Sequence, residues 1–224
     1  MSLKNLIVVA GLVLVTTIYV GCVDVPDKAP EFPDFRTQTR FIQADPALGS
    51  AQITVDGSGV ATVNYQEASE YLNLPAGNRV MAVSGETQSV ALESDGKVTV
   101  VVFPKESPTA TRFRVYRERR TFDALVDTVA QIRFINAGLE ADGSIVPYNI
   151  IDMADSSNVV LELSFRQNSG YLNLKAGSYK FGVRVSGTED VVTTADVTVA
   201  NGERHTAVIF GEQASLTLKP FKDD

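Results

Sequence analysis

The sequence contains few of the residues on which catalysis and metal binding most often depend. Its 224 residues include one cysteine, one histidine and no tryptophan. A single cysteine excludes an intramolecular disulfide, and one histidine without a second cysteine supplies no cluster of ligands for a metal ion. No glycine-rich phosphate-binding loop is present. The composition therefore predicts no metal and no cofactor, and it favours a protein that is not an enzyme.

Charge and aromatic content narrow the range of partners. The net charge is −7, whereas general binding to nucleic acid requires an excess of basic residues, so no nucleic-acid partner is expected. A sugar-binding platform would have to use tyrosines, because tryptophan is missing. A hydrolase that uses His205 is a further functional hypothesis, and it is disfavoured because no nucleophile elbow precedes that histidine.

An internal repeat runs through the chain. The heptapeptide YLNLPAG at residues 71–77 returns as YLNLKAG at residues 171–177. The blocks RFIQA and TVVVF match RFINA and TAVIF in the same order, beginning at residues 40, 99, 133 and 206. Three ordered matches indicate two tandem copies of one unit, and their unequal spacing indicates longer loops in the second copy.

The repeated heptapeptide suggests a turn between two strands. Proline fixes one backbone dihedral and glycine permits a positive φ, so Pro75-Ala76-Gly77 predicts a tight turn. The residues that follow alternate between apolar and polar, which is typical of a half-buried strand. We therefore predict a hairpin in the core of each copy, with structural signature residues Tyr71, Leu72, Leu74, Gly77, Tyr171, Leu172, Leu174 and Gly177.

The first 21 residues resemble a secretory signal peptide. Lys4 supplies a positive charge, residues 6–15 form an apolar segment, and Cys22 follows Gly21. A lone cysteine after such a segment resembles a bacterial lipobox, although Tyr19 stands where leucine is usual. The alternatives are cleavage elsewhere or an uncleaved anchor, but a membrane span needs about 20 apolar residues. We expect lipidation of Cys22 and a place in the cell envelope, anchored to the outer membrane on its periplasmic or surface side.

The remainder of the chain divides into a tether and two domains. Residues 22–35 contain prolines and acidic residues, which is typical of a linker. Residues 98–103 are almost all β-branched or aromatic and predict a central strand buried on both faces. Short strands separated by Gly, Asp and Pro turns predict two β-sandwiches. The expected boundaries are 36–120 and 128–220 for the sandwiches, 121–127 for the linker and 221–224 for the tail.

One basic cluster interrupts the acidic sequence: Arg112, Arg114, Arg117, Arg119 and Arg120. Arg112 and Arg114 alternate with apolar residues, which predicts an edge strand whose charged face lies in water and protects the edge from pairing. The alternative is a patch for an anionic surface polymer or for lipid headgroups.

The repeated blocks resemble an uncharacterised family of bacterial extracellular domains, known only as a domain of unknown function. Its members read roughly V-R-F-x-N-A-S-P, then V-D-V-Y-V-D-G, then Y-L-x-L-P-A-G-x-Y. The first block appears at residues 40–46 and 133–137, the second at 52–57, and the third is the heptapeptide. The second copy departs from the pattern after residue 137. The resemblance implies two immunoglobulin-like β-sandwiches on a secreted or lipid-anchored protein, with no known catalytic residues.

These observations predict an all-β fold of two tandem immunoglobulin-like antiparallel β-sandwich domains. The leading functional hypothesis is a lipid-anchored, non-enzymatic structural or interaction module of the cell envelope. The alternative is an adhesin-like protein that binds a glycan or an anionic cell-surface polymer. The membrane is the expected partner of the lipid anchor, and the sequence identifies neither a protein or polysaccharide partner nor an oligomeric state.

Overall fold

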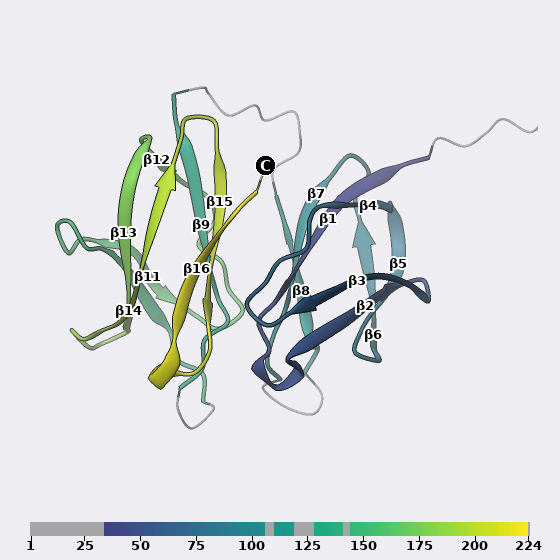
Figure 1. The fold of residues 1–224 in the computed structure, drawn as a ribbon, viewed down its shortest axis with the longest axis horizontal. Coiled ribbons are helices and arrows are strands. Elements are labelled where there is room, and N and C mark those ends of the chain that lie inside the picture. The colour runs from purple at the N-terminus through teal and green to yellow at the C-terminus, as the bar shows by residue number, and fades with distance from the viewer. Residues whose placement is uncertain (1–33, 106–109, 119–127, 141–143, 224) are drawn as a thin grey trace, which may run out of the picture. The chain divides into compact units, whose positions relative to one another are not determined.

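The computed structural model describes residues 34–105, 110–118, 128–140 and 144–223. These residues form strands β1 to β16 and two short 3-10 turns, η1 (Pro46–Leu48) and η2 (Gln213–Ser215) (Figure 1). Within these ranges, no helix is long and apolar enough to cross a membrane. The predicted all-β fold is confirmed.

The first sandwich consists of two four-stranded sheets. One sheet has the order β4-β1-β7-β8 and the other has the order β3-β2-β5-β6. Its strands are β1 (Arg36–Gln43), β2 (Ser50–Val55), β3 (Ser58–Asn64), β4 (Leu72–Pro75), β5 (Gly77–Val83), β6 (Glu86–Leu92), β7 (Lys97–Val102) and β8 (Phe113–Arg117).

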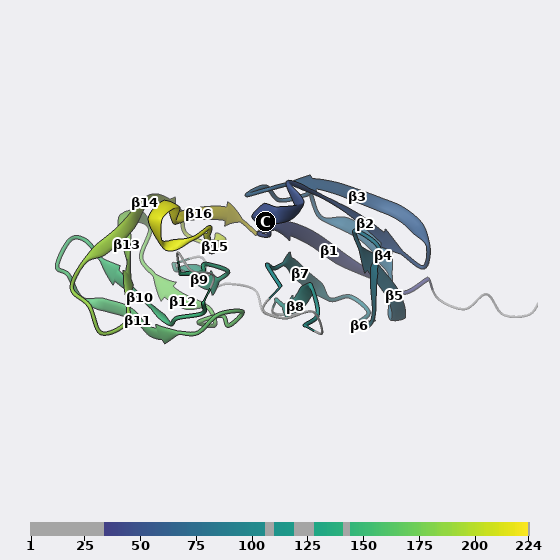
Figure 2. The same cartoon turned by 90° about the horizontal axis from the view of Figure 1, so that it is seen from below.

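The second sandwich repeats this topology strand for strand. Its sheets have the orders β12-β9-β15-β16 and β11-β10-β13-β14 (Figure 2). In each sandwich one pair, β1 with β7 or β9 with β15, is parallel, and the other pairings are antiparallel. Its strands are β9 (Ala130–Asn136), β10 (Tyr148–Asp152), β11 (Asn158–Leu163), β12 (Leu172–Leu174), β13 (Gly177–Val185), β14 (Val191–Val199), β15 (Arg204–Phe210) and β16 (Thr217–Lys222).

Three apolar clusters hold the strands together. Each sandwich has its own core between its two sheets. A third cluster joins the sandwiches, because Ile42 and Phe103 of the first pack in one group with Ile135 and Phe210 of the second. Strand β7 contributes to both environments: alternate residues enter the first core and the third cluster. This explains why it is buried on both faces, as predicted.

The predicted hairpin at the repeated heptapeptide is wrong. Strand β4 pairs with β1 and strand β5 pairs with β2, so the Pro-Ala-Gly segment carries the chain from one sheet to the other. Gly77 has the expected positive φ of +100°, and the N–H of Ala76 donates to the carbonyl of Phe35 at 2.9 Å. The local pattern defined the turn but not the partner strands, because sheet partners lie far away in the sequence.

The expected domain boundaries stay predictions. The linker 121–127 lies outside the described residues, as does most of the tether. Strand β16 continues to Lys222, so the first residues of the expected tail belong to the second sandwich.

Candidate functional site

The signature tyrosines lead to a buried polar cluster between the two sandwiches, which we call the seam. Each sandwich supplies one arginine, one threonine, one tyrosine and one carboxylate from equivalent positions. The side chains of the arginines and carboxylates are at most 3% exposed. The seam consists of Arg40, Thr99, Tyr71 and Glu118 from the first sandwich and Arg133, Thr206, Tyr171 and Asp223 from the second.

Within each sandwich the hydroxyl groups hold the carboxylate in place. The Tyr71 hydroxyl donates to Glu118 Oε1 at 2.7 Å, and Thr99 Oγ1 donates to the same oxygen at 2.5 Å. The second sandwich repeats this arrangement: Tyr171 and Thr206 donate to Asp223 Oδ2 at 2.7 and 2.9 Å.

The closest ion pairs of the seam cross from one sandwich to the other, and a longer pair of 4.0 Å joins Arg40 Nη2 to Glu118 Oε1 within the first. Arg40 Nη2 of the first lies 2.5 Å from Asp223 Oδ1 of the second. In the mirrored contact, Arg133 Nη2 of the second lies 3.1 Å from Glu118 Oε1 of the first. Each buried carboxylate is therefore oriented by its own sandwich and neutralised by the other, and the seam joins the two repeats.

Burial also controls the ionisation of the seam. It raises the pKa of both Tyr71 and Tyr171, and the neighbouring guanidinium groups of Arg40 and Arg133 offset only part of that effect. Both phenols therefore stay protonated and can donate their hydrogen bonds. Burial alone would lower the pKa of Arg40, but the charge of Asp223 and the other acidic neighbours outweighs it, so the pKa is raised.

The signature leucines and glycines have structural positions outside the seam. Leu72 and Leu74 pack in the core of the first sandwich, and Leu172 and Leu174 pack in the core of the second. Gly77 and Gly177 are the first residues of β5 and β13, which belong to the sheets opposite β4 and β12.

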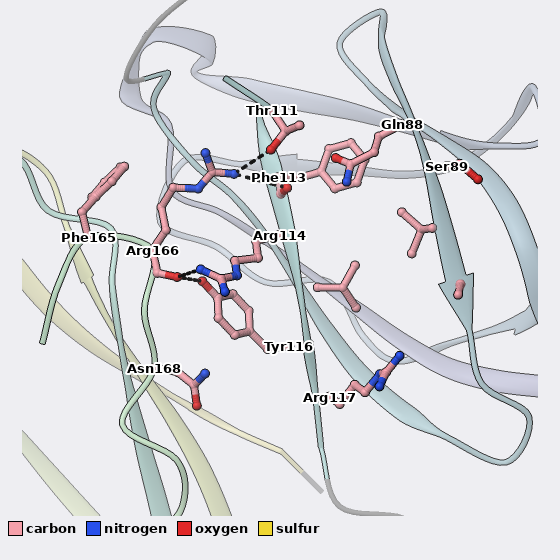
Figure 3. Close-up of a pocket in the computed structure, with 13 residues that line it drawn as sticks. Gln88, Ser89, Thr111, Phe113, Arg114, Tyr116, Arg117, Phe165, Arg166 and Asn168 are labelled. Atoms are coloured by element: carbon pink, nitrogen blue, oxygen red, sulfur yellow. Dashed lines mark hydrogen bonds between the residues drawn. The ribbon is translucent and has the colours of Figure 1, made fainter. Parts of the chain in front are cut away.

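The predicted arginine patch is only partly assembled. Arg112 is directed to Asp45 and Glu86, and its ion pair with Glu86 measures 3.3 Å. Burial raises the pKa of Asp45, although Arg112 and the N–H of Ala47 act against that effect. Arg114 and Arg117 line an open groove of about 840 Å³ (Figure 3). Arg119, Arg120 and the expected lipidation site Cys22 lie outside the described residues.

The groove, which we call the arginine groove, runs along the outer edge of β8. On one side it is bounded by Gln88, Ser89, Val90 and Ala91 of β6, and all five residues of β8 line it. Lining residues from the second sandwich include Phe165, Arg166 and Asn168. Thus the arginine groove borders both sheets of the first sandwich and a loop of the second.

Arg166 is a residue of the arginine groove that the sequence interpretation missed. Its carbonyl accepts from Arg114 Nη1 at 2.8 Å and from the Tyr116 hydroxyl at 2.7 Å. Its own Nη2 donates to Thr111 Oγ1 at 3.1 Å and to the carbonyl of Phe113 at 3.4 Å. Arg166 lies in the loop after β11, and no sequence pattern connects it to β8, so only the packing of the sandwiches could reveal it.

The histidine does not belong to a larger cluster. His205 is buried, and its Nε2 lies 3.2 Å from Glu203 Oε2. Glu203 also accepts from Lys222 and from the N–H of Ala200, and these bonds, with that of Lys222 foremost, lower its pKa to about 2. Across the described ranges, no group of three or more His, Cys, Asp and Glu residues is placed to hold a metal ion.

The repeated seam and the duplicated topology agree with the comparison of families. The model of a domain of unknown function, DUF4397, matches residues 37–143 and 145–224. The chain belongs to the DUF4397 family. The suspected resemblance to tandem copies of a bacterial domain of unknown function is therefore confirmed.

Solved structures add little to this DUF4397 assignment. The TIE protein of Bacillus anthracis is 11% identical with a TM-score of 0.27, and the match covers 80% of this chain and 34% of the TIE protein. A candidate cell adhesion protein of Bacteroides uniformis is 11% identical with a TM-score of 0.29, and the match covers 88% of this chain and 99% of that protein. Similarity this low supports no functional conclusion, and this chain spans about a third of the first protein. The comparison with curated proteins gave no match.

Proposed function

We propose that this DUF4397 protein is a non-enzymatic interaction module of the cell envelope, anchored through a lipid on Cys22. Two buried carboxylates support the non-enzymatic part of the proposal. Glu118 and Asp223 are buried in the seam and accept hydrogen bonds from neighbouring residues, which leaves them inaccessible to a substrate. Their role is to join two sandwiches into one binding unit.

The observation that carries the interaction role is the arginine groove. Arg114, Arg117 and Arg166 border an open hollow whose volume suits part of a polymer or peptide. In a chain with a net charge of −7, a local concentration of arginine favours an anionic partner by charge complementarity. An anionic envelope ligand is therefore the partner class that we propose for this site.

The anchor can be tested on intact cells. Mass spectrometry of the N-terminal peptide should find Cys22 diacylated or triacylated, and Cys22→Ser should release the protein from the membrane fraction. Added protease should cleave the anchored protein if it faces outward. An unmodified N-terminus would overturn the lipid anchor, whereas protection until the envelope is opened would restrict the module to the periplasm.

The anionic partner can be tested with the purified soluble part of the chain, beginning after Cys22. Binding of a panel of acidic polymers and acidic peptides should weaken as the salt concentration rises and should fall at least tenfold in Arg114→Gln with Arg117→Gln. The matched control is Arg79→Gln, which removes a partly exposed arginine paired with Asp56 away from the arginine groove. Equal loss in the control, or no binding by any member of the panel, would reject the proposal.

A further inference from the structure

The outer edge of β8 carries main-chain groups that face the arginine groove. The carbonyl of Arg112 accepts from the N–H of Phe103, directly after β7, and the N–H of Glu118 donates to the carbonyl of Lys97. The antiparallel register places Val115 opposite Val100. Because hydrogen bonding alternates along an antiparallel strand, the main chain of Phe113, Val115 and Arg117 points away from β7. These N–H and C=O groups lie along the groove that all five residues of β8 line.

Most of these edge groups are available to a ligand. Within the described residues, the carbonyls of Phe113 and Arg117 accept only long bonds of 3.4 Å, from Arg166 and Arg133. In the part of the chain that the structure describes, no side chain bonds to the N–H or C=O of Val115, and β7 is the single strand that pairs with β8. A main chain with paired donors and acceptors along an unoccupied edge is a template for another extended chain.

The second sandwich shows that the repeat does not require this open edge. The strand equivalent to β8 is β16, and the ladder places Pro220 opposite Ala207, the position that Val115 holds opposite Val100. Proline has no N–H, so Pro220 blocks pairing at the centre of that edge. Strand β14 also packs against β16. Among the described residues, the edge of β16 in the second sandwich is therefore blocked to strand pairing, whereas the edge of β8 in the first sandwich is open.

The surroundings of β8 specify the side chains of an incoming strand. Phe113 and Val115 face the first core, in which Val115 is partly buried and Val90 of β6 is buried. Even-numbered residues face the second sandwich, where Arg114 and Arg166 lie (Figure 3). Because successive side chains of a strand point to opposite faces, a strand added to β8 would direct one set towards apolar residues and the other towards arginines.

We propose that β8 accepts an extended segment of a partner protein in which apolar and acidic residues alternate, bound by strand addition. This inference rests on the proposed interaction function and defines the ligand class of the same groove. A polypeptide main chain matches the spacing of the edge groups, whereas an anionic polysaccharide would bind through the arginine side chains alone. The apolar set covers Val115, and the acidic set pairs with Arg114 and Arg166.

The test uses an acetylated, fluorescently labelled peptide of alternating glutamate and valine, measured by fluorescence anisotropy. Val115→Pro removes the outward N–H and leaves the bonds to β7 intact, as Pro220 does in the second sandwich. Val115→Ala is the matched control, since it shortens the side chain but keeps the N–H. We expect Val115→Pro to weaken binding about tenfold or more and Val115→Ala to weaken it only slightly.

A second measurement changes the ligand and leaves the protein unaltered. Methylating alternate peptide nitrogens along the pairing edge preserves charge and side chains, and we expect it to abolish binding, as should replacement of glutamate by lysine. Equal binding of the methylated peptide, equal binding by Val115→Pro, or no binding of the parent peptide would each overturn strand addition. The proposal would also be overturned if the protein associated with itself and Val115→Pro prevented this association, because the edge would then bind a second copy.

The outcome separates this inference from the proposed function. If an acidic polysaccharide such as polygalacturonate binds in an Arg114-dependent way and Val115→Pro does not affect it, strand addition fails while the anionic interaction role stands. If no anionic peptide or polymer binds, both fail.

Discussion

In the second sandwich, β14 packs against β16 and Leu216 and Leu218 of that edge lie in the core. In the first sandwich, the equivalent strands β6 and β8 border the arginine groove instead. The two copies nevertheless share their strand order and contribute matching residues to the seam. The two copies therefore share the contacts that hold them together and differ at an edge strand, where substitution disturbs the core least.

The largest effect is expected where the two copies are alike. Asp223→Ala removes the carboxylate closest to Arg40 and leaves this buried guanidinium only the more distant Glu118 at 4.0 Å, so it should cost about 3–5 kcal/mol of unfolding free energy. Glu118→Ala should cost a similar amount, since Arg133 loses its acid in the same way. Urea denaturation measures both.

A paired replacement is the control for the seam. Arg40→Met combined with Asp223→Leu removes both charges and should recover most of the loss, because a buried ion pair is often replaceable by apolar residues. A double variant as unstable as Asp223→Ala would show that packing, rather than the unpaired charge, causes the loss.

The closed and open edges should differ in their sensitivity to truncation. Leu218 is 3% exposed in the core of the second sandwich, so Leu218→Ala should cost about 2–5 kcal/mol. Val115 is only partly buried beside the arginine groove, so Val115→Ala should cost about 1.5 kcal/mol or less. Thermal and chemical unfolding of the two variants provide the comparison, and equal losses would contradict the assignment of an open edge.

Alkaline pH should weaken both halves of the seam equally. The pKa values of Tyr71 and Tyr171 are raised above 10 in the folded protein, whereas the unfolded phenols ionise near 10. Their contribution to stability is complete below pH 10 and is lost as pH rises towards the folded pKa. Each tyrosine should add a slope of about 1.4 kcal/mol per pH unit above pH 10.

Phenylalanine substitutions isolate these slopes. Tyr71→Phe and Tyr171→Phe should each lower the slope of unfolding free energy against pH by the amount of one proton, as measured by denaturation between pH 9 and 11.5. If either variant kept the slope of the unaltered protein, the tyrosine that it replaces would ionise in the folded state as readily as in the unfolded state.

The smallest effect concerns the rim of the arginine groove. Arg117 Nη1 lies 3.1 Å from Glu93 Oε1, and both side chains are exposed, so Glu93→Gln should change stability by less than about 1 kcal/mol. The same change should strengthen the binding of an acidic polymer, because Arg117 no longer has an internal competitor. Weaker binding would show that Glu93 positions Arg117 rather than competing for it.

Much of the architecture could be predicted from local patterns. Alternation and turn residues located the strands, and the repeated blocks indicated two copies. The β-branched run at residues 98–103 identified a strand that is buried on both faces. The failure concerned pairing at a distance: the heptapeptide was assigned to a hairpin, and the buried carboxylates that Tyr71 and Tyr171 contact were not foreseen.

The seam left a signal in the sequence that the interpretation did not use. Arg40 and Arg133 occur at the same place in the two RFI blocks, inside strands whose other residues are apolar. A charge that both copies retain inside a buried strand requires a partner. Its identity could not be inferred, because Glu118 and Asp223 follow edge strands far along the chain, and Arg166 reaches the arginine groove only through the packing of the sandwiches.

The pairing of Arg40 with Asp223 also sets the order of events during synthesis. The two residues are 183 positions apart, so synthesis of the first sandwich ends before the acid closest to its buried arginine has been made. Until then, Ile42 and Phe103 on the same face remain in water. Contacts between such distant residues form slowly, and the exposed face is prone to aggregate while it waits. Docking of the second sandwich covers this face and brings Asp223 to Arg40.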